Sequence, residues 1–252
     1  MMRLGNAVLS VALLSACGGA ANPSAGAADA TEIGALVKNL AAGQLEALPT
    51  GPVYIQVTMF TQPAGGVIPS KKHVPGIILE QKGLQRLLVE GSPPLDIHSG
   101  EADFLPSVTH EHLNPGPGGN VWYNFALWPE SARSAPLTSP IATVAFSTPD
   151  LPASALPAGA YSISLQMTSL TPHGRTQARS FGGVSVLFVL TGSISAHTAG
   201  GTAVTLGPGG GAWSPGGTGL QEFEDTGQPA TFVTFVVAAV GQPFETALSH
   251  GV

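Results

Sequence analysis

Hydrophobic positions recur with a helical period only near the start of the chain, at residues 33–43. Ile33, Leu36, Val37 and Leu40 would share one face of a helix that ends near Gly43. Beyond residue 49 this period disappears, and short β-rich runs alternate with Gly and Pro clusters. The runs cover residues 53–60, 76–79, 84–89, 121–127, 141–146, 161–170, 184–190, 194–197 and 231–237. The pattern predicts a short N-terminal helix followed by an all-β fold.

The β-rich part of the chain repeats itself at a nearly constant offset. Leu-Pro-Thr-Gly at 48–51 corresponds to Leu-Pro-Ala-Gly at 156–159, and the strands that follow have the same pattern. Residues 100 and 106 correspond to residues 209 and 215, as Gly and Pro in both copies. Repeats as long as this are whole domains, because solenoid repeats are much shorter. We therefore predict two copies of one small β-barrel.

The first residues have the pattern of an export signal. Arg3 precedes a mostly apolar stretch that ends at Leu14 and is shorter than the roughly 20 residues of a membrane span. The sequence Leu-Ser-Ala-Cys that follows resembles the bacterial lipoprotein signal, which implies cleavage before Cys17 and lipidation of that residue. A plain signal peptide with an incidental cysteine is the alternative. We expect a signal peptide at 1–16, a flexible tether at 17–31, and anchoring at the cell envelope, facing the periplasm or the outside.

Composition narrows the class of protein. Charged residues make up 10% of the 252 residues, and apolar residues 43%. Ordinary disorder is excluded because it needs high net charge and few apolar residues. Helical bundles are excluded by the 33 Gly and 22 Pro. Nucleic acid is a poor partner, since the net charge is −6 and the longest basic run is Lys71-Lys72.

The second half of the chain resembles the cupin superfamily. The spacing over residues 179–192 resembles the first cupin motif, G-x5-H-x-H-x3-E-x6-G, and the spacing over 209–224 the second, G-x5-P-x-G-x2-H-x3-N. The resemblance covers roughly residues 50–240 and implies two tandem jelly-roll barrels. We place the first barrel, with its leading helix, at 32–135 and the second at 150–248. In this family the motif histidines and glutamate hold a divalent metal ion.

The second barrel lacks the residues that this chemistry needs. The four positions that correspond to the family's ligands are Arg179, Phe181, Ser185 and Leu220. None of them is a ligand of the imidazole or carboxylate type. Arg179 is a candidate for binding an anionic ligand, and a structural ion pair with an acid such as Glu222 or Glu224 is the alternative. Trp213 is a candidate for ligand stacking or, alternatively, packs in the core.

The first barrel has more residues that can bind a metal ion. The offset of the repeat places Lys71, His73 and Ile77 at the positions of the first motif, and His110 or His112 occupies the histidine position of the second. Residues i and i+2 of a strand share a face, so His110 and His112 would point the same way. His73 from a neighbouring strand would complete a three-nitrogen metal site with open positions. Lys71 is then a candidate for stabilising an anionic intermediate.

These observations leave three functions. We expect a non-catalytic bicupin that binds a small organic ligand or has a structural role. The alternative is a metal-dependent enzyme, a hydrolase or lactonase or an oxygenase, that uses Zn, Fe, Mn or Ni in the first barrel. The third is metal-free acid–base catalysis with His73 or His110 as the base. A homodimer is expected by analogy with cupins that pair through sheet edges.

Overall fold

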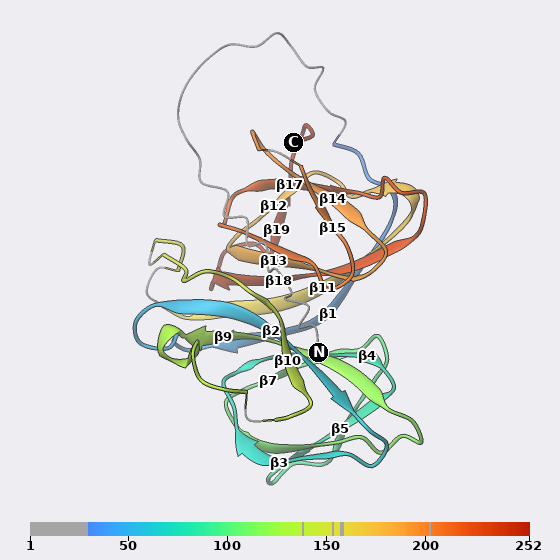
Figure 1. The fold of residues 1–252 in the computed structure, drawn as a ribbon. Coiled ribbons are helices and arrows are strands. Elements are labelled where there is room, and N and C mark those ends of the chain that lie inside the picture. The colour runs from blue at the N-terminus through green and yellow to red at the C-terminus, as the bar shows by residue number, and fades with distance from the viewer. Residues whose placement is uncertain (1–29, 138, 153, 157–158, 202) are drawn as a thin grey trace, which may run out of the picture.

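The computed structural model describes residues 30–137, 139–152, 154–156, 159–201 and 203–252. Strands dominate these residues, and Figure 1 shows two barrels, one above the other. The strands of the first half are β1 (Ile33–Leu45), β2 (Val53–Gln62), β3 (Val67–Lys72), β4 (Gly76–Lys82), β5 (Leu84–Val89), β6 (Leu95–His98), β7 (Ala102–Leu105), β8 (Thr109–Leu113) and β9 (Asn120–Pro129). A 3-10 turn, η1 (Glu130–Ala132), and β10 (Ala142–Ser147) follow. The strands of the second half are β11 (Tyr161–Arg175), β12 (Arg179–Phe181), β13 (Val184–Thr191), β14 (Ile194–Thr198), β15 (Val204–Leu206), β16 (Gly211–Ser214), β17 (Gly219–Phe223), β18 (Ala230–Ala239) and β19 (Glu245–Ala247).

Each barrel is built from antiparallel strands. In the first barrel two sheets have the strand orders β10-β2-β9-β4-β7 and β3-β8-β5-β6. In the second barrel one continuous sheet has the order β15-β14-β17-β11-β18-β13-β16. It is continuous because the long strand β11 pairs with β18 through most of its length and with β17 at its end. This arrangement agrees with the predicted pair of jelly rolls.

The predicted N-terminal helix is wrong, because residues 33–45 form strand β1. This strand pairs antiparallel with β11 along its whole length, from Ile33 opposite Arg175 to Leu45 opposite Tyr161. Its register shifts once between Ile33 and Ala35 and again between Asn39 and Ala41. Each shift breaks the two-residue alternation of a strand, so the apolar spacing came to resemble a helical period. Pairing with a distant strand supplies the backbone hydrogen bonds that a helix would have supplied locally.

The two halves exchange strands. β1 directly precedes the first barrel in the chain, yet it pairs with β11 of the second barrel. β10 precedes the second barrel in the chain, yet it pairs with β2 of the first barrel. Figure 1 shows the blue β1 running beside the second barrel. β2 and β11 are themselves counterparts in the repeat, since each follows one of the two Leu-Pro-x-Gly segments. The exchange is therefore reciprocal, and it ties the halves together through their backbones.

A single apolar core fills the space between the barrels. Phe125 of the first half lies with its ring centroid 6.1 Å from Phe188 and 5.9 Å from Phe235 of the second half. All three side chains are fully buried. Burial of aromatic rings of this size is a large favourable term in folding, so the halves are expected to unfold together. In the described ranges no helix has the length and hydropathy of a membrane span.

Candidate metal centre

Three histidines of the first barrel, His73, His110 and His112, come together from β8 and from the segment directly after β3. In the antiparallel β3–β8 pair, Lys71 lies opposite His110 and Ile68 lies opposite His112. His73 follows directly after β3. Because alternate residues of β8 face the same side, both of its imidazoles enter the barrel, where they are almost completely buried. The structure thus brings His73, His110 and His112 to one place.

The three imidazoles lie within the reach of a single ion. One ring nitrogen from each residue can be chosen so that all three atoms lie within 4.8 Å of one another. His110 Nε2 and His112 Nε2 are 3.0 Å apart. The ring centroid of His73 lies 4.9 Å from that of His110 and 5.9 Å from that of His112. In the part of the chain that the structure describes, no other cluster of three His, Cys, Asp or Glu side chains meets this geometry.

A neighbouring carbonyl fixes which nitrogen of His110 is available, and the orientation of a neighbouring amide decides it for His112. His110 Nδ1 lies 3.0 Å from the carbonyl oxygen of Val108, which can only accept, so Nδ1 carries the proton and Nε2 keeps its lone pair. The side-chain amide of Gln85 contacts His112 Nδ1 at 2.9 Å through its nitrogen, while its Oε1 has no partner. A half-turn of this amide would let Oε1 accept from Nδ1–H and leave the lone pair of His112 on Nε2. His73 Nε2 is buried and has no partner.

Electrostatics keep the rings neutral at physiological pH. Burial lowers the pKa of His73 to about 4, and the nearby His110 and Lys71 contribute to that lowering. Burial also lowers the pKa of His110, partly offset by its bond to Val108, and holds the pKa of His112 well below its usual value. A neutral imidazole is the form that binds a metal ion. These histidines therefore need no deprotonation before they bind a cation at pH 7.

The space around the rings is small and mostly apolar. A cavity of about 30 Å³ lies among the histidines. Its other walls come from Phe60, Ile68, Val74, Gly76, Ile78, Leu105, Trp122 and Asn124. A buried water needs on the order of 10–15 Å³, so the cavity has room for an ion and little else.

Trp122 forms one wall of the centre. Its ring stacks on His112 at a centroid distance of 4.6 Å and on Phe60 at 3.9 Å. Its Nε1 donates to Gln62 Oε1 at 2.9 Å. The indole therefore holds the His112 ring in place by packing against it.

Two further residues near the histidines lie outside the site. Asn114 directly follows β8, and its amide nitrogen donates to the carbonyls of Gln62, Pro63 and Gly118. The offset of the repeat placed Ile77 in the metal site, but Ile77 lies in the core between the barrels. The strand pairing shows a slip of one position between the two copies. Gly76 pairs with Ala126, and Ser185 pairs with Val236, the counterpart of Ala126. The structural counterpart of Ser185 is therefore Gly76 and not Ile77. Such a slip exchanges the two faces of a strand, so Gly76 takes the place beside the histidines.

The position of Lys71 follows from the register. Since Lys71 lies directly opposite His110 in the β3–β8 pair, the two residues share a face of the sheet. Its charge is close enough to lower the pKa of His73. Its side chain is exposed and is not among the residues that line the cavity.

The corresponding region of the second barrel is filled by side chains. Phe181 and Leu220, which take the places of His73 and His110, pack with Val236 and Ala238 in a small apolar cluster. Glu222 takes the place of His112, because Arg179 pairs with Leu220 in the same way as Lys71 pairs with His110.

The structure gives the contacts of the two remaining candidates of the second half, Arg179 and Trp213. Arg179 Nη2 lies 3.3 Å from Glu222 Oε2, and both side chains are buried. This ion pair is the alternative that the sequence left open for Arg179. Trp213 is partly buried and packs against the core between the barrels. Glu224 accepts hydrogen bonds from the backbone of the following turn. Cys17 lies outside the described residues.

Comparison with known proteins identifies the fold. No family model matches this sequence, and no curated protein matches it. A mutant of Bacillus subtilis oxalate decarboxylase superimposes with a TM-score of 0.56 at 10% identity, over 81% of this chain and 79% of that one. The fold is that of the cupins. Another structure of the same enzyme, concerned with its Mn(II) centres, gives a TM-score of 0.55 at 10% identity, over 86% of this chain and 80% of that one.

A third structure is more distant. Salicylate 1,2-dioxygenase from Pseudoaminobacter salicylatoxidans has a TM-score of 0.46 at 12% identity, over 72% of this chain and 71% of that one. At these identities a likeness concerns the fold alone. The superposition on oxalate decarboxylase confirms the predicted all-β class of cupin jelly rolls.

Proposed function

We propose that the first barrel is the site of a metal-dependent enzyme in which His73, His110 and His112 hold one divalent cation. The observation that carries this proposal is the unpartnered Nε2 of His73, buried beside two neutral imidazoles. A buried nitrogen without a partner costs free energy, and a bound cation would recover it. Three protein nitrogens leave further coordination positions open, as catalytic ions require.

The cation would have to be one that accepts nitrogen ligands. Zn, Fe, Mn and Ni all bind imidazole. Oxalate decarboxylase of B. subtilis, which has this fold, has Mn(II) centres, so Mn is the first ion to test. The absence of metal ligands from the second barrel favours a non-catalytic protein. The three clustered histidines of the first barrel favour the alternative, a metal-dependent enzyme.

The chain's own residues define what the site would accept. A bound divalent ion would act as a Lewis acid toward water for hydrolysis of an ester or lactone, or, as a redox-active ion such as Fe or Mn, would supply electrons to oxygen for oxygenation. Val108 and Gln85 hold the imidazoles, and Trp122 and Phe60 form an apolar wall beside them. The exposed, cationic Lys71, which lies opposite His110 in the β3–β8 pair, favours substrates with an anionic group. We infer a small organic substrate with such a group, and the identity of the ion would decide between the two reactions.

Metal analysis of the purified full-length chain tests the proposal. We expect about one equivalent of a divalent ion, and a rise in Tm when the ion is added back after chelation. A His73→Ala/His110→Ala variant should lose both, whereas His98→Ala, at an exposed histidine of β6, should keep both. A folded protein that takes up none of the four ions and does not change its Tm would overturn the proposal. Loaded protein would then be assayed with esters, lactones and small carboxylates that include oxalate.

We also propose the location and assembly that the sequence suggests. Lipidation of Cys17 would anchor the protein at the cell envelope, with residues 17–31 as the tether. A Cys17→Ser variant should then appear in the soluble fraction, and intact mass should show no lipid. The barrels at 32–135 and 150–248, and a homodimer, are tested by limited proteolysis and by light scattering.

A further inference from the structure

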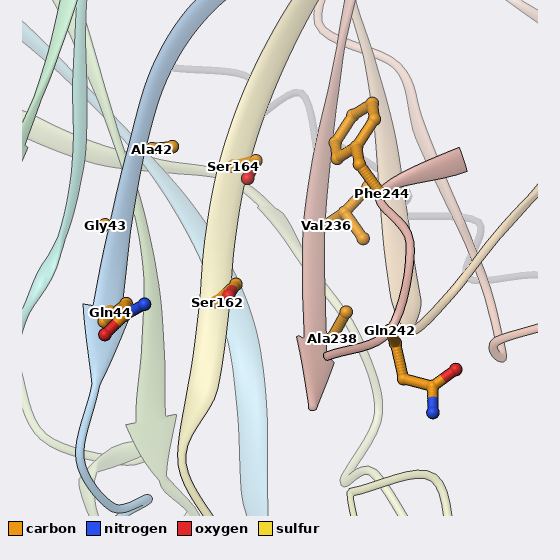
Figure 2. A pocket seen from close by; sticks show the side chains of 9 residues that line it. All are labelled: Ala42, Gly43, Gln44, Ser162, Ser164, Val236, Ala238, Gln242 and Phe244. Carbon is orange, nitrogen blue, oxygen red and sulfur yellow. The ribbon is translucent and has the colours of Figure 1, made fainter. Parts of the chain in front are cut away.

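An open cavity of about 430 Å³ lies at the mouth of the second barrel, far in sequence from the histidines. Figure 2 shows its floor, formed by β1, β11 and β18, and its wall, formed by the segment after β18 that carries Gln242 and Phe244. The volume is in the range of roughly 300–1,000 Å³ that small-molecule sites occupy. It is much larger than the cavity at the histidines, which holds about 30 Å³.

The lining of this mouth combines polar and apolar side chains, and it carries no charged side chain among the described residues. Gln44, Ser162 and Ser164 line one side from β1 and β11, together with Ala42. Val236, Ala238 and Phe244 line the other side, together with Gln242. A partner with an ionic group would find no counter-charge in this lining. A neutral molecule with hydroxyl groups along one edge and an apolar face would match both sides.

The polar side chains of β11 continue inward along the same face of the strand. Gln166 and Thr168 follow Ser162 and Ser164 at two-residue intervals, and Thr234 lies opposite Gln166 on β18. All three are more than nine-tenths buried. Gln166 Oε1, Thr168 Oγ1 and Thr234 Oγ1 have no hydrogen-bond partner. Unpartnered buried polar atoms are uncommon in native proteins, and here three gather beyond one open cavity.

The first barrel shows that this mouth is specific to the second copy. The counterparts of Ser162 and Ala238 are Tyr54 and Trp128, which pair across β2 and β9 as Ser162 and Ala238 pair across β11 and β18. Tyr54 is buried, and the guanidinium of Arg133 covers its ring at 3.9 Å. Large aromatic side chains therefore occupy the mouth in the first copy. In the second copy a hydroxymethyl and a methyl group leave it open.

We propose that the mouth of the second barrel binds a neutral, hydroxyl-rich small molecule of the carbohydrate class. Gln44, Ser162, Ser164 and Gln242 bind its hydroxyl groups, and Phe244 packs against its C–H face. Gln166, Thr168 and Thr234 accept or donate deeper in the barrel, directly or through water. This site is independent of the metal centre, so its occupancy needs no metal.

The test uses metal-free full-length protein and calorimetry with glucose, galactose, sucrose and maltose as neutral probes. Glucuronate and gluconate serve as anionic probes of similar size. We expect saturable binding of at least one neutral sugar and weaker binding of the anions. Failure of every neutral sugar to bind, or binding of the anions alone, would overturn the proposal. Because the protein is metal-free, the result is separate from that of the metal analysis.

Two variants locate the binding. Ser162→Tyr/Ala238→Trp introduces the side chains that the first barrel has at the corresponding positions, and it should abolish sugar binding. Gln44→Ala, at an exposed position of β1, should weaken binding roughly three- to tenfold, as expected for one neutral hydrogen bond, without affecting the fold. The matched control is Thr143→Tyr, at an exposed position of β10, which should bind like the wild type. Unchanged affinity in Gln44→Ala and in a folded double variant would contradict the site.

Discussion

His110 Nε2 and His112 Nε2 face each other across 3.0 Å inside the first barrel. Two neutral imidazoles at this distance share one proton, unless a cation takes both lone pairs. The carbonyl of Val108 fixes a proton on His110 Nδ1, so His110 Nε2 carries none. Whether a proton lies between the two Nε2 atoms therefore depends on His112. The amide that contacts His112 is that of Gln85, and its orientation decides which nitrogen of His112 is free.

The first prediction concerns this amide. Gln85→Met removes the hydrogen-bond partner of His112 Nδ1 and keeps the length of the side chain. Outer partners of metal-bound histidines typically contribute roughly 10- to 100-fold to affinity, so we expect metal binding to weaken by about that factor. Competition with a chromogenic chelator measures it. Gln81→Met, at a partly exposed position of β4, is the control, and equal affinities in the two variants would contradict the role of Gln85.

The second prediction concerns the pH dependence of stability. Burial raises the pKa of Glu80 to about 8, against bonds from the backbone of Lys82 and Val121 that lower it. The side chain is fully buried, and Asn120 Nδ2 lies 3.5 Å from its carboxyl group. In unfolded chains this carboxyl loses its proton near its ordinary value of 4.5, so between pH 4.5 and 8 only the folded state binds the proton. Its contribution to stability therefore falls as pH rises through this window.

Glu80→Gln should remove this dependence. The free energy of unfolding of wild type, relative to the variant, should decrease between pH 5 and 8 by at most about 1.4 kcal/mol per pH unit. Urea denaturation at several pH values measures the difference. Glu111→Gln, at a partly exposed position of β8, is the control. A difference between wild type and Glu80→Gln that does not vary with pH would mean that Glu80 is ionised in the folded protein.

The third prediction concerns the strand exchange. A Cβ at Gly211 would lie 2.6 Å from the ring of Phe146, which β10 places against the second half. Phe146 is buried and has little room to move, so Gly211→Ala should cost about 1–3 kcal/mol of stability. Gly207→Ala, where no atom lies within 4 Å, is the control. Chemical denaturation measures both, and adding Phe146→Leu should recover part of the loss.

The fourth prediction concerns the buried pair Arg179–Glu222. Thr176 Oγ1 also donates to Glu222 Oε2 at 2.6 Å, so the carboxyl group remains bound on one side when Arg179 is replaced. Arg179→Met should still cost about 3–5 kcal/mol, because it leaves a buried charge without its counter-charge. Arg179→Met/Glu222→Gln should restore most of the stability, as measured by urea denaturation. A double variant as unstable as the single one would show that Arg179 acts through packing, for example on Phe181.

Local patterns in the sequence predicted much of the fold and part of the site. The repeat in the β-rich part appears in the structure as corresponding strands, such as β2 with β11. The shared direction of His110 and His112 follows from the two-residue period of a strand, which needs no information about distant residues. Gln85 gave only a weak signal, as one of two adjacent polar residues, with Arg86, in the otherwise apolar β5.

By itself the sequence determined the all-β class, the duplication and the loss of histidines from the second copy, because these depend on composition, spacing and residue type. Only the tertiary structure decided that residues 33–45 form a strand, since their partner β11 lies in the other half of the chain. The tertiary structure also brings His73 beside His110 and places Gly76, rather than Ile77, next to them. It pairs Arg179 with Glu222 as well. Each of these depends on strand register, and register is set by pairing between distant segments rather than by the residues of one segment.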